Sequence, residues 1–143
     1  VANQIEASLQ KHQFVDEGVY AGNADGKDLN FTPGSVEYCR HFDIQIQSWG
    51  SLCQGLYTVG DLTNASQADI NTSILVNKLA ALYDTTPEAI VLAWLLRHPA
   101  LIQPIIGTTN VERIAASCGA LNVTLSREHW YALYVSAKGH ELP

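Results

Sequence analysis

Three short segments of the chain have the residue pattern of β-strands. Residues 44–49 read Ile-Gln-Ile-Gln-Ser-Trp, and such strict alternation of apolar and polar side chains is typical of a strand. Residues 1–6 and 101–106 predict two further short strands. In the last of these, Ile105 and Ile106 form a β-branched pair, which is expected where a strand is covered on both faces.

Apolar residues at helical spacing occupy much of the chain between and after these strands. Thr86, Pro87 and Glu88 supply an N-cap, a first-turn proline and an acidic first turn for one of the helices. Trp94 and Trp130 lie at amphipathic positions and are predicted to belong to the core. The predicted helices cover residues 34–41, 70–82 and 89–98, and two more begin at Asn110 and Ser126.

Two long segments, residues 7–33 and 50–66, lack a sustained period and are predicted to be loops. Strands separated by helices pair in parallel, so the loops that follow them lie together at one edge of the sheet, where α/β proteins bind ligands. Three parallel strands are too few to close a barrel, and an open sheet leaves an unpaired edge at each side. The pattern therefore predicts an α/β fold whose architecture is incomplete within residues 1–143.

Residues 104–114 predict a strand that passes through a small-residue turn into a capped helix, an arrangement that binds phosphate. Gly107 lets the backbone turn tightly and approach a ligand. Thr109 and Glu112 have capping-box spacing, so the free N–H groups and the positive end of the helix dipole face an anion. Arg113 adds a full charge one turn into the helix. An ordinary strand-to-helix connection with a solvated arginine is the alternative.

Composition excludes several classes of function. The chain has 143 residues, a formal net charge of −6 and no basic run, so no nucleic-acid or membrane partner is expected. Three widely spaced cysteines without a Cys-x-x-Cys pair predict reduced thiols rather than disulfides or a zinc site. The histidines show no metal-ligand spacing. Without a leader-like start or a spanning apolar run, a cytoplasmic protein is expected.

Four segments carry a resemblance to a known family. They are Ala-Asn-Gln-Ile-Glu at 2–6, Gln-Ser-Trp-Gly-Ser-Leu at 47–52, the helix at 86–96 and the phosphate-binding segment at 104–114. In order and spacing they resemble the C-terminal half of an aldo-keto reductase, and residues 126–143 are similar to a bacterial branch. The resemblance implies a single partial domain over residues 1–143, holding strands six to eight of a (β/α)8 TIM barrel with their helices.

The resemblance also implies a cofactor half-site. Gln4 matches the glutamine that hydrogen-bonds the nicotinamide carboxamide, with a polar barrel residue as the alternative. Trp49 takes the place of the aromatic residue, usually tyrosine, that stacks on the nicotinamide ring, with a plain core tryptophan as the alternative. Gly50, Ser51 and Leu52 match the loop that passes the pyrophosphate, where free backbone N–H groups matter more than side chains.

At the phosphate-binding segment, Thr108 and Arg113 match the family positions that hold the adenosine 2′-phosphate. Thr109 belongs to the same turn, and Ser117 falls where an asparagine often meets the adenine. Gly107 departs from the lysine that is common there, which removes one cation and leaves most of the charge recognition to Arg113. The resemblance implies NADP as the cofactor, and the cation missing at Gly107 leaves NAD open as the alternative.

No catalytic residue is assigned within this chain. The Asp, Tyr, Lys and His of the family's catalytic tetrad lie in the N-terminal half of the barrel, and their motifs are absent from this sequence. The loop after the first strand offers the same four residue types, but all four sit together and are predicted to be solvated loop residues. They are Lys11, His12, Asp16 and Tyr20.

The resemblance implies an oxidoreductase that reduces a small-molecule carbonyl substrate, present here as a fragment that is inactive alone. The start within strand-like sequence favours truncation or proteolysis of a longer reductase. Two alternatives stay open: a non-catalytic nucleotide-binding or scaffold module, and one half of a split enzyme that pairs with a separate N-terminal half. Self-association would also cover the unpaired edges of the sheet.

Overall fold

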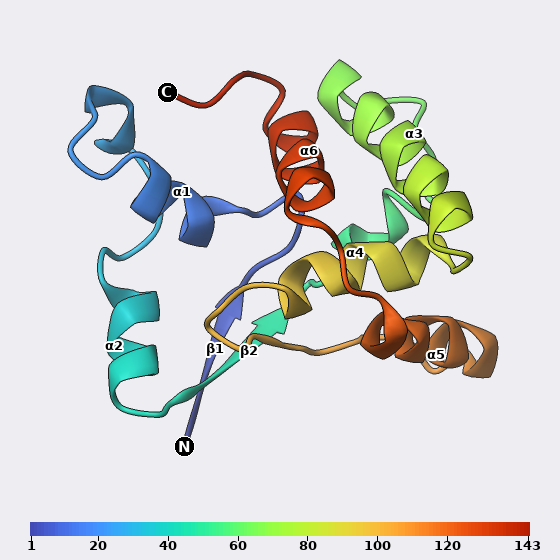
Figure 1. The fold of residues 1–143 in the computed structure, drawn as a ribbon, viewed down its shortest axis with the longest axis horizontal. Coiled ribbons are helices and arrows are strands. Elements are labelled where there is room, and N and C mark those ends of the chain that lie inside the picture. Colours follow the sequence, from blue (N-terminus) through green and yellow to red (C-terminus); the bar gives the residue numbers. More distant parts are fainter.

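The computed structural model describes residues 1–143 as a three-stranded sheet with helices around it (Figure 1). The strands are β1 (Ala2–Glu6), β2 (Gln45–Trp49) and β3 (Gln103–Pro104). The α-helices are α1 (Gln13–Val19), α2 (Ser35–His41), α3 (Gln67–Leu82), α4 (Pro87–Leu96), α5 (Val111–Cys118) and α6 (Arg127–Lys138). Three short 3₁₀ helices are η1 (Ala24–Gly26), η2 (Cys53–Gly55) and η3 (Gly119–Asn122).

The three strands form one parallel sheet in the order β1-β2-β3. Helices lie between successive strands along the chain, as parallel pairing requires. Both outer strands keep one unpaired edge, because the sheet is open. The predicted α/β fold with parallel strands, part of a barrel rather than a closed one, is confirmed.

The third strand is shorter than the predicted residues 101–106. Leu101 adopts a positive φ of 52°, which is not an extended conformation. One more ladder bond follows the strand, since the Ile105 N–H donates to the Ser48 carbonyl over 2.8 Å. Ile105 is 38 % exposed, so the expectation of cover on both faces is wrong for this residue.

The two faces of the sheet differ in their environment. Ile46, Ser48 and Ile102 are buried, whereas the alternating residues Gln45 and Trp49 are exposed. Only one face of the sheet therefore packs against the core.

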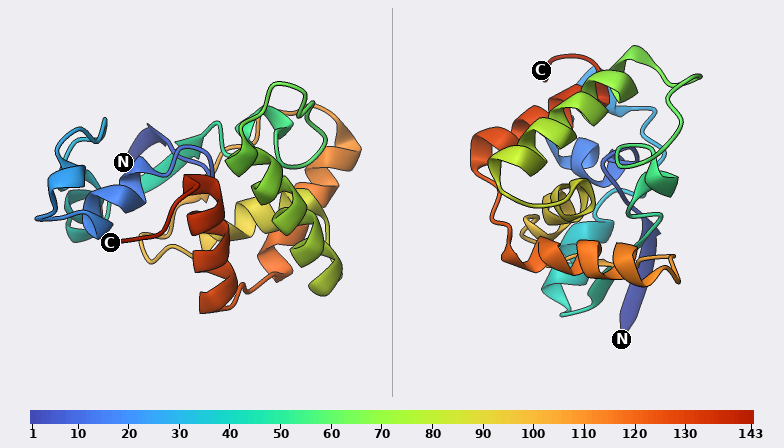
Figure 2. Two further views of the ribbon diagram at one scale, coloured as in Figure 1. Left: turned by 90° about the horizontal axis from the view of Figure 1, so that it is seen from above. Right: turned by 90° about the vertical axis from the view of Figure 1, so that its right-hand side faces the viewer.

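Helix α4 is the centre of that core, and every residue from Ala89 to Leu95 is buried. Helices α3 and α6 run side by side in all views (Figures 1 and 2). A hydrogen bond of 2.8 Å between the hydroxyls of Thr72 and Ser136 joins them.

Residues 7–33 are not the continuous loop that the sequence predicts, because α1 and η1 lie within them. Phe14 and Val15 of α1 are buried, and the Phe14 ring meets the Trp94 ring edge-on at a centroid distance of 5.9 Å. An α1 of seven residues is too short for its period to stand out in the sequence. Tertiary packing therefore decides its conformation.

Asp16 and Tyr20 are buried, at 3 % and 4 % exposure, so the prediction of solvated loop residues is wrong for both. The Asp16 carboxylate accepts hydrogen bonds from the His12 ring at 2.8 Å, from the Lys138 ammonium at 3.1 Å and from the Tyr134 hydroxyl. Burial raises the pKa of Asp16, but the three hydrogen bonds and the His12 charge outweigh it and lower this pKa to about 2. The cluster fastens α1 to α6.

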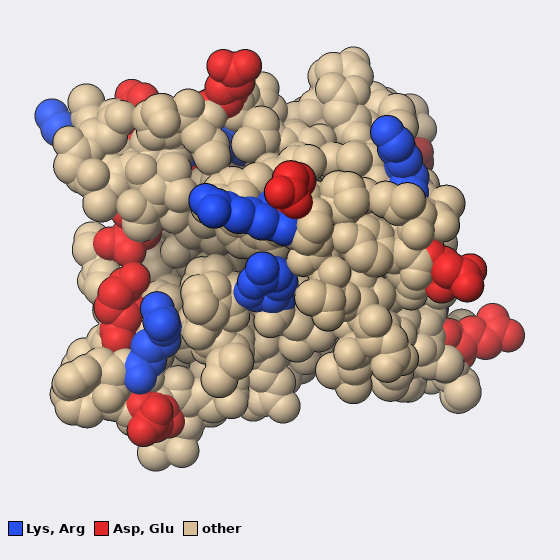
Figure 3. Space-filling view, viewed as in Figure 1, with Lys and Arg blue, Asp and Glu red and all other residues tan.

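The surface carries few charges on the face drawn in Figure 3, where acidic and basic side chains are set in much larger uncharged areas. No single helix is long and apolar enough to cross a membrane. Helices α3 and α4 reach the necessary length and apolar composition only when taken together, and the pair is bent by 96°.

Candidate functional site

A cavity of about 430 Å³ lies beyond the carboxyl ends of β2 and β3. Its walls come from the loop after β2, the segment after β3, and the first turns of α4 and α5. The lining residues are Trp49, Gly50, Ser51, Leu52, Gln54, Gly55, Thr58, Glu88, Ile105, Gly107, Thr108 and Arg113.

Seven of the ten residues assigned to a cofactor from the sequence line this one cavity. They come from two segments more than fifty residues apart, which the parallel pairing of β2 and β3 brings together. The seven are Trp49, Gly50, Ser51, Leu52, Gly107, Thr108 and Arg113. The other three, Gln4, Thr109 and Ser117, lie outside it.

The loop after β2 is held against the segment after β3 by one buried side chain. Ser51 is 1 % exposed, and its hydroxyl donates to the Ile105 carbonyl over 2.9 Å. Gly50 has a positive φ of 66°, so the backbone turns here in a conformation that favours glycine. The N–H groups of Ser51 and Leu52 donate to no acceptor in the protein, which leaves them free for a ligand.

Gly107 plays a different part from the tight turn that the sequence predicts. Its φ is not positive, and a Cβ added to it would meet no atom within 4 Å. The backbone does not require glycine at this position. The missing side chain instead leaves open space beside the cavity.

The N-terminus of α5 is capped by Asn110, not by the predicted Thr109. The Asn110 side chain accepts from the Arg113 N–H over 3.1 Å, and the Thr108 hydroxyl accepts from the Asn110 N–H over 3.2 Å. The capping box of Thr109 and Glu112 is therefore wrong, because the neighbouring Asn110 makes the cap. Thr109 is exposed and outside the cavity.

Arg113 is exposed and forms no ion pair, since no carboxylate oxygen lies within 4.0 Å of its guanidinium. It is the only basic residue among those lining the cavity, and Glu88 is the only acidic one. From the sequence, Arg113 was predicted to bind phosphate. Glu88 was predicted only to mark the start of a helix.

Trp49 forms the rim between this cavity and a neighbouring one of about 470 Å³. Trp49 is 48 % exposed, so it does not belong to the core that residues 1–143 form among themselves. The neighbouring cavity also contains Cys53, and burial raises the pKa of the Cys53 thiol. A thiol in that state is a poor nucleophile.

Gln4 lies on the open face of the sheet, at the end of a row of amides. Its Nε2 donates to Gln47 Oε1 over 2.9 Å, and Gln47 Nε2 donates to Gln103 Oε1 over 2.9 Å. Strand register creates the row, because Gln4 pairs with Gln47 and Gln47 with Gln103. The side-chain oxygen of Gln4, Oε1, accepts no hydrogen bond in the protein.

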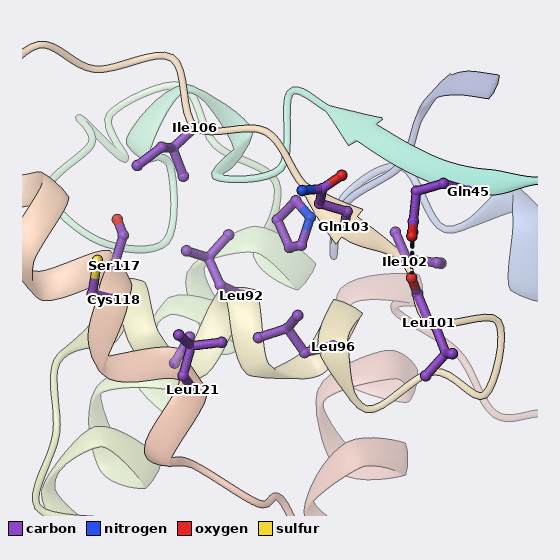
Figure 4. Close-up of a pocket in the computed structure, with 12 residues that line it drawn as sticks. Gln45, Leu92, Leu96, Leu101, Ile102, Gln103, Ile106, Ser117, Cys118 and Leu121 are labelled. Carbon is purple, nitrogen blue, oxygen red and sulfur yellow. Dashed lines mark hydrogen bonds between the residues drawn. The ribbon is translucent and has the colours of Figure 1, made fainter. Parts of the chain in front are cut away.

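Ser117 lies one turn after Arg113 in α5 and lines a different, apolar cavity of about 450 Å³ between α4, α5 and β3. Its hydroxyl donates to the Arg113 carbonyl over 2.7 Å and is therefore occupied. Figure 4 shows Ser117 and Cys118 across from Leu92, with Ile106 on a third side. The structure thus places Ser117 apart from the side chains that line the first cavity.

No three His, Cys, Asp or Glu side chains are close enough to hold a metal ion. The Asp16 cluster does unite an aspartate, a histidine, a tyrosine and a lysine. Its four side chains satisfy one another, and none lines the cavity at the end of β2. We assign the cluster to the packing of α1 on α6.

Comparison with known proteins identifies relatives of this chain. The Aldo/keto reductase family matches residues 23–134. A 6-dehydroglucose reductase of Agrobacterium fabrum is 33% identical over 147 residues, which cover 99% of this chain and 40% of that protein. The oxidoreductase YdhF of Escherichia coli is 36% identical over 77% of this chain and 35% of its own length.

Solved structures agree with these relatives in fold. The chain is similar to a thermostable aldo-keto reductase solved with the inhibitor epalrestat, with a TM-score of 0.64 and 20% identity over 95% of this chain and 39% of that one. The structure of aldose reductase from Giardia lamblia matches with a TM-score of 0.58 and 15% identity, over 99% of this chain and 38% of that one. The chain spans about two fifths of the length of its relatives. It belongs to the aldo/keto reductase family.

Proposed function

We propose that residues 1–143 form the nucleotide-binding part of a single barrel domain, in an oxidoreductase that reduces a small-molecule carbonyl compound with NADP or NAD. The observation that carries the proposal is the cavity that gathers Trp49, the loop at 50–52 and Arg113. The names of the relatives, a 6-dehydroglucose reductase and an oxidoreductase, support the class of reaction.

The lining of the cavity fits the phosphates of a dinucleotide. The N–H groups of Ser51 and Leu52 are free, and those of a loop like this bind anions well. Arg113 is unpaired at the N-terminal end of α5, where the helix dipole adds to its charge. The open space at Gly107 gives a phosphate room to approach the backbone.

A nicotinamide cofactor supplies the hydride when it is bound. In our proposal the half-exposed Trp49 stacks on the nicotinamide ring and fixes the face that it presents. The side-chain oxygen of Gln4 accepts a hydrogen bond from the carboxamide of the nicotinamide. Gln47 and Gln103 hold the Gln4 side-chain amide in place.

The proton for the carbonyl oxygen needs another source. Glu88 and Arg113 are the only residues in the cavity lining with an acidic or basic side chain, and no tyrosine, histidine, lysine or cysteine lines it. We propose that the proton donor lies in the remaining part of the barrel and that these 143 residues alone bind nucleotide without turnover. The same observation favours, as a second candidate, a non-catalytic nucleotide-binding module.

The exposed sheet face and its two unpaired edges support a polypeptide partner. A separate or covalently linked remainder of the barrel fits this surface, as does a second copy of the chain. Native mass measurement distinguishes them, because a monomer of 15.6 kDa excludes self-association and a mass near twice that value supports it.

Titration of the 143-residue chain with NADPH tests the proposal. Arg113→Ala is expected to weaken binding roughly 5- to 150-fold, the range for a charge-assisted contact. Arg40→Ala is the matched control, because Arg40 is also exposed and without an ion pair but lies outside the cavity. Equal affinity of the Arg113 variant and the parent chain contradicts the assignment of this arginine, and turnover of an aldehyde by the chain contradicts its predicted inactivity.

A further inference from the structure

Glu88 and Arg113 lie near the starts of two different helices, Glu88 as the second residue of its helix and Arg113 as the third. Each lies in the first turn, Glu88 in α4 and Arg113 in α5, and both line the cavity at the end of β2. No ion pair joins them, since their charged atoms are more than 4.0 Å apart. Both charges are therefore available to act on a ligand in the cavity.

The local sequence explains why α4 begins at this cavity. The Thr86 hydroxyl accepts from the Ala89 N–H over 3.2 Å, and Pro87 follows the cap. A helix start of this kind attracts an anion through its dipole. Glu88 places a carboxylate at that position and offsets the attraction from within the protein.

We propose that Glu88 is a specificity-determining residue that weakens the preference of this cavity for a nucleotide with a 2′-phosphate. The proposal rests on the nucleotide-binding function proposed above. One acidic and one basic side chain leave the cavity lining without net side-chain charge. A 2′-phosphate adds up to two negative charges to a dinucleotide, so Glu88 repels NADP more than NAD.

Shared lining of one cavity brings a ligand next to both charges. Glu88 and Arg113 both line the cavity of about 430 Å³, and charges are strongly screened only beyond roughly one Debye length, about 8 Å at physiological salt. Gly107 contributes no cation, so Arg113 alone opposes Glu88. The balance between NADP and NAD therefore depends on two residues.

Isothermal titration with 2′,5′-ADP and with 5′-AMP, which differ only in the 2′-phosphate, tests the inference on the 143-residue chain. Glu88→Gln is expected to raise the affinity for 2′,5′-ADP by roughly three- to tenfold and that for 5′-AMP by less. The gain is expected to shrink in high salt. Glu88→Asp keeps the charge and is expected to keep the parent's ratio of the two affinities, which separates the charge from any change in folding.

Glu112→Gln is the matched control, because Glu112 is the acidic residue in the first turn of α5 and lies outside the cavity lining. A larger gain for Glu88→Gln than for Glu112→Gln supports the inference. Binding of both nucleotides with an unchanged ratio in Glu88→Gln overturns it and leaves the proposed function intact. Failure of the parent chain to bind either nucleotide overturns the proposed function, and the inference with it.

Discussion

Trp94 and Trp130 exchange hydrogen bonds. The Trp94 indole N–H donates to the Trp130 carbonyl over 3.1 Å, and the Trp130 indole N–H donates to the Trp94 carbonyl over 2.9 Å. Their rings stack with an interplanar angle of 9° and a centroid distance of 5.1 Å. Because Trp94 is fully buried, this pair joins α6 to the centre of the core.

Trp130→Phe is expected to destabilise the fold by about 1–3 kcal/mol, because the buried Trp94 carbonyl loses its donor while much of the ring stacking remains. Urea denaturation measures the loss. Tyr131→Phe is the control, since Tyr131 is 38 % exposed and its hydroxyl has no partner, so a change within about 0.5 kcal/mol is expected. Equal effects of the two substitutions would contradict the role of the exchanged bonds.

Asp16→Asn is expected to cost about 3–5 kcal/mol of stability, because the Lys138 ammonium is left buried without a counter-charge. The side chains of Lys138 and Asp16 are only 8% and 4% exposed. Thermal or chemical unfolding checks the value. Asp28→Asn removes an exposed carboxylate that forms no hydrogen bond or ion pair, and it is expected to change stability little. A small loss for Asp16→Asn would show that the cluster is not a structural tie.

The same carboxylate makes stability depend on pH. Its pKa is lowered from 3.8 to about 2 in the folded chain, so between these values the unfolded chain binds more protons. The stabilisation that the Asp16 carboxylate contributes is therefore fully present above about pH 4. It is lost as the pH falls toward 2, and the loss amounts to about 2 kcal/mol in total. Unfolding midpoints at several pH values measure this loss. The slope should flatten in Asp16→Asn, and an unchanged slope would assign the acid sensitivity to other groups.

Much of the fold follows from local pattern. The alternation at 44–49 predicted β2, and the cap expected at Thr86 is present, accepting from the N–H three residues later. The helix predicted to begin at Ser126 is present as well, and the Ser126 side chain caps it. At α5 two adjacent residues are able to cap, and the sequence favoured Thr109 over Asn110. Pattern located that helix start to within one residue but did not decide between neighbours.

The residues of the candidate site likewise fall into those that the sequence predicted and those that it did not. Segments with strong turn and helix-start signals, residues 49–52 and 107–113, were predicted and meet in one cavity. Glu88 and Thr58 also line it, yet neither has a local signal for binding. The Asp16 cluster was missed because 118 residues separate Asp16 from Tyr134, and only tertiary packing brings them together.

Ser48→Ala is expected to stabilise the fold by about 1 kcal/mol. Ser48 is fully buried in β2, and its hydroxyl has no hydrogen-bond partner in the protein, so removing it abolishes a desolvation cost. Ser8→Ala provides the contrast, because the equally buried Ser8 hydroxyl accepts from the Lys11 N–H over 3.0 Å. Its loss is expected to destabilise. Urea midpoints that shift in the same direction for both variants would refute this account.

Ser51→Ala tests how the two walls of the cavity are held together. The hydrogen bond from Ser51 to the Ile105 carbonyl joins the loop after β2 to the segment after β3, so its loss is expected to cost about 0.5–1.5 kcal/mol of stability. Because both walls belong to the proposed nucleotide site, affinity for ADP is expected to fall as well, by several-fold.

Ser35→Ala removes another hydroxyl-to-carbonyl bond, from the Ser35 hydroxyl to the Thr32 carbonyl over 2.8 Å, at an exposed place outside the cavity lining. It is expected to reduce stability without changing ADP affinity. Titration and urea unfolding of both variants separate the two effects. A parallel loss of affinity in Ser35→Ala would mean that general destabilisation, rather than the tie between Ser51 and Ile105, controls binding.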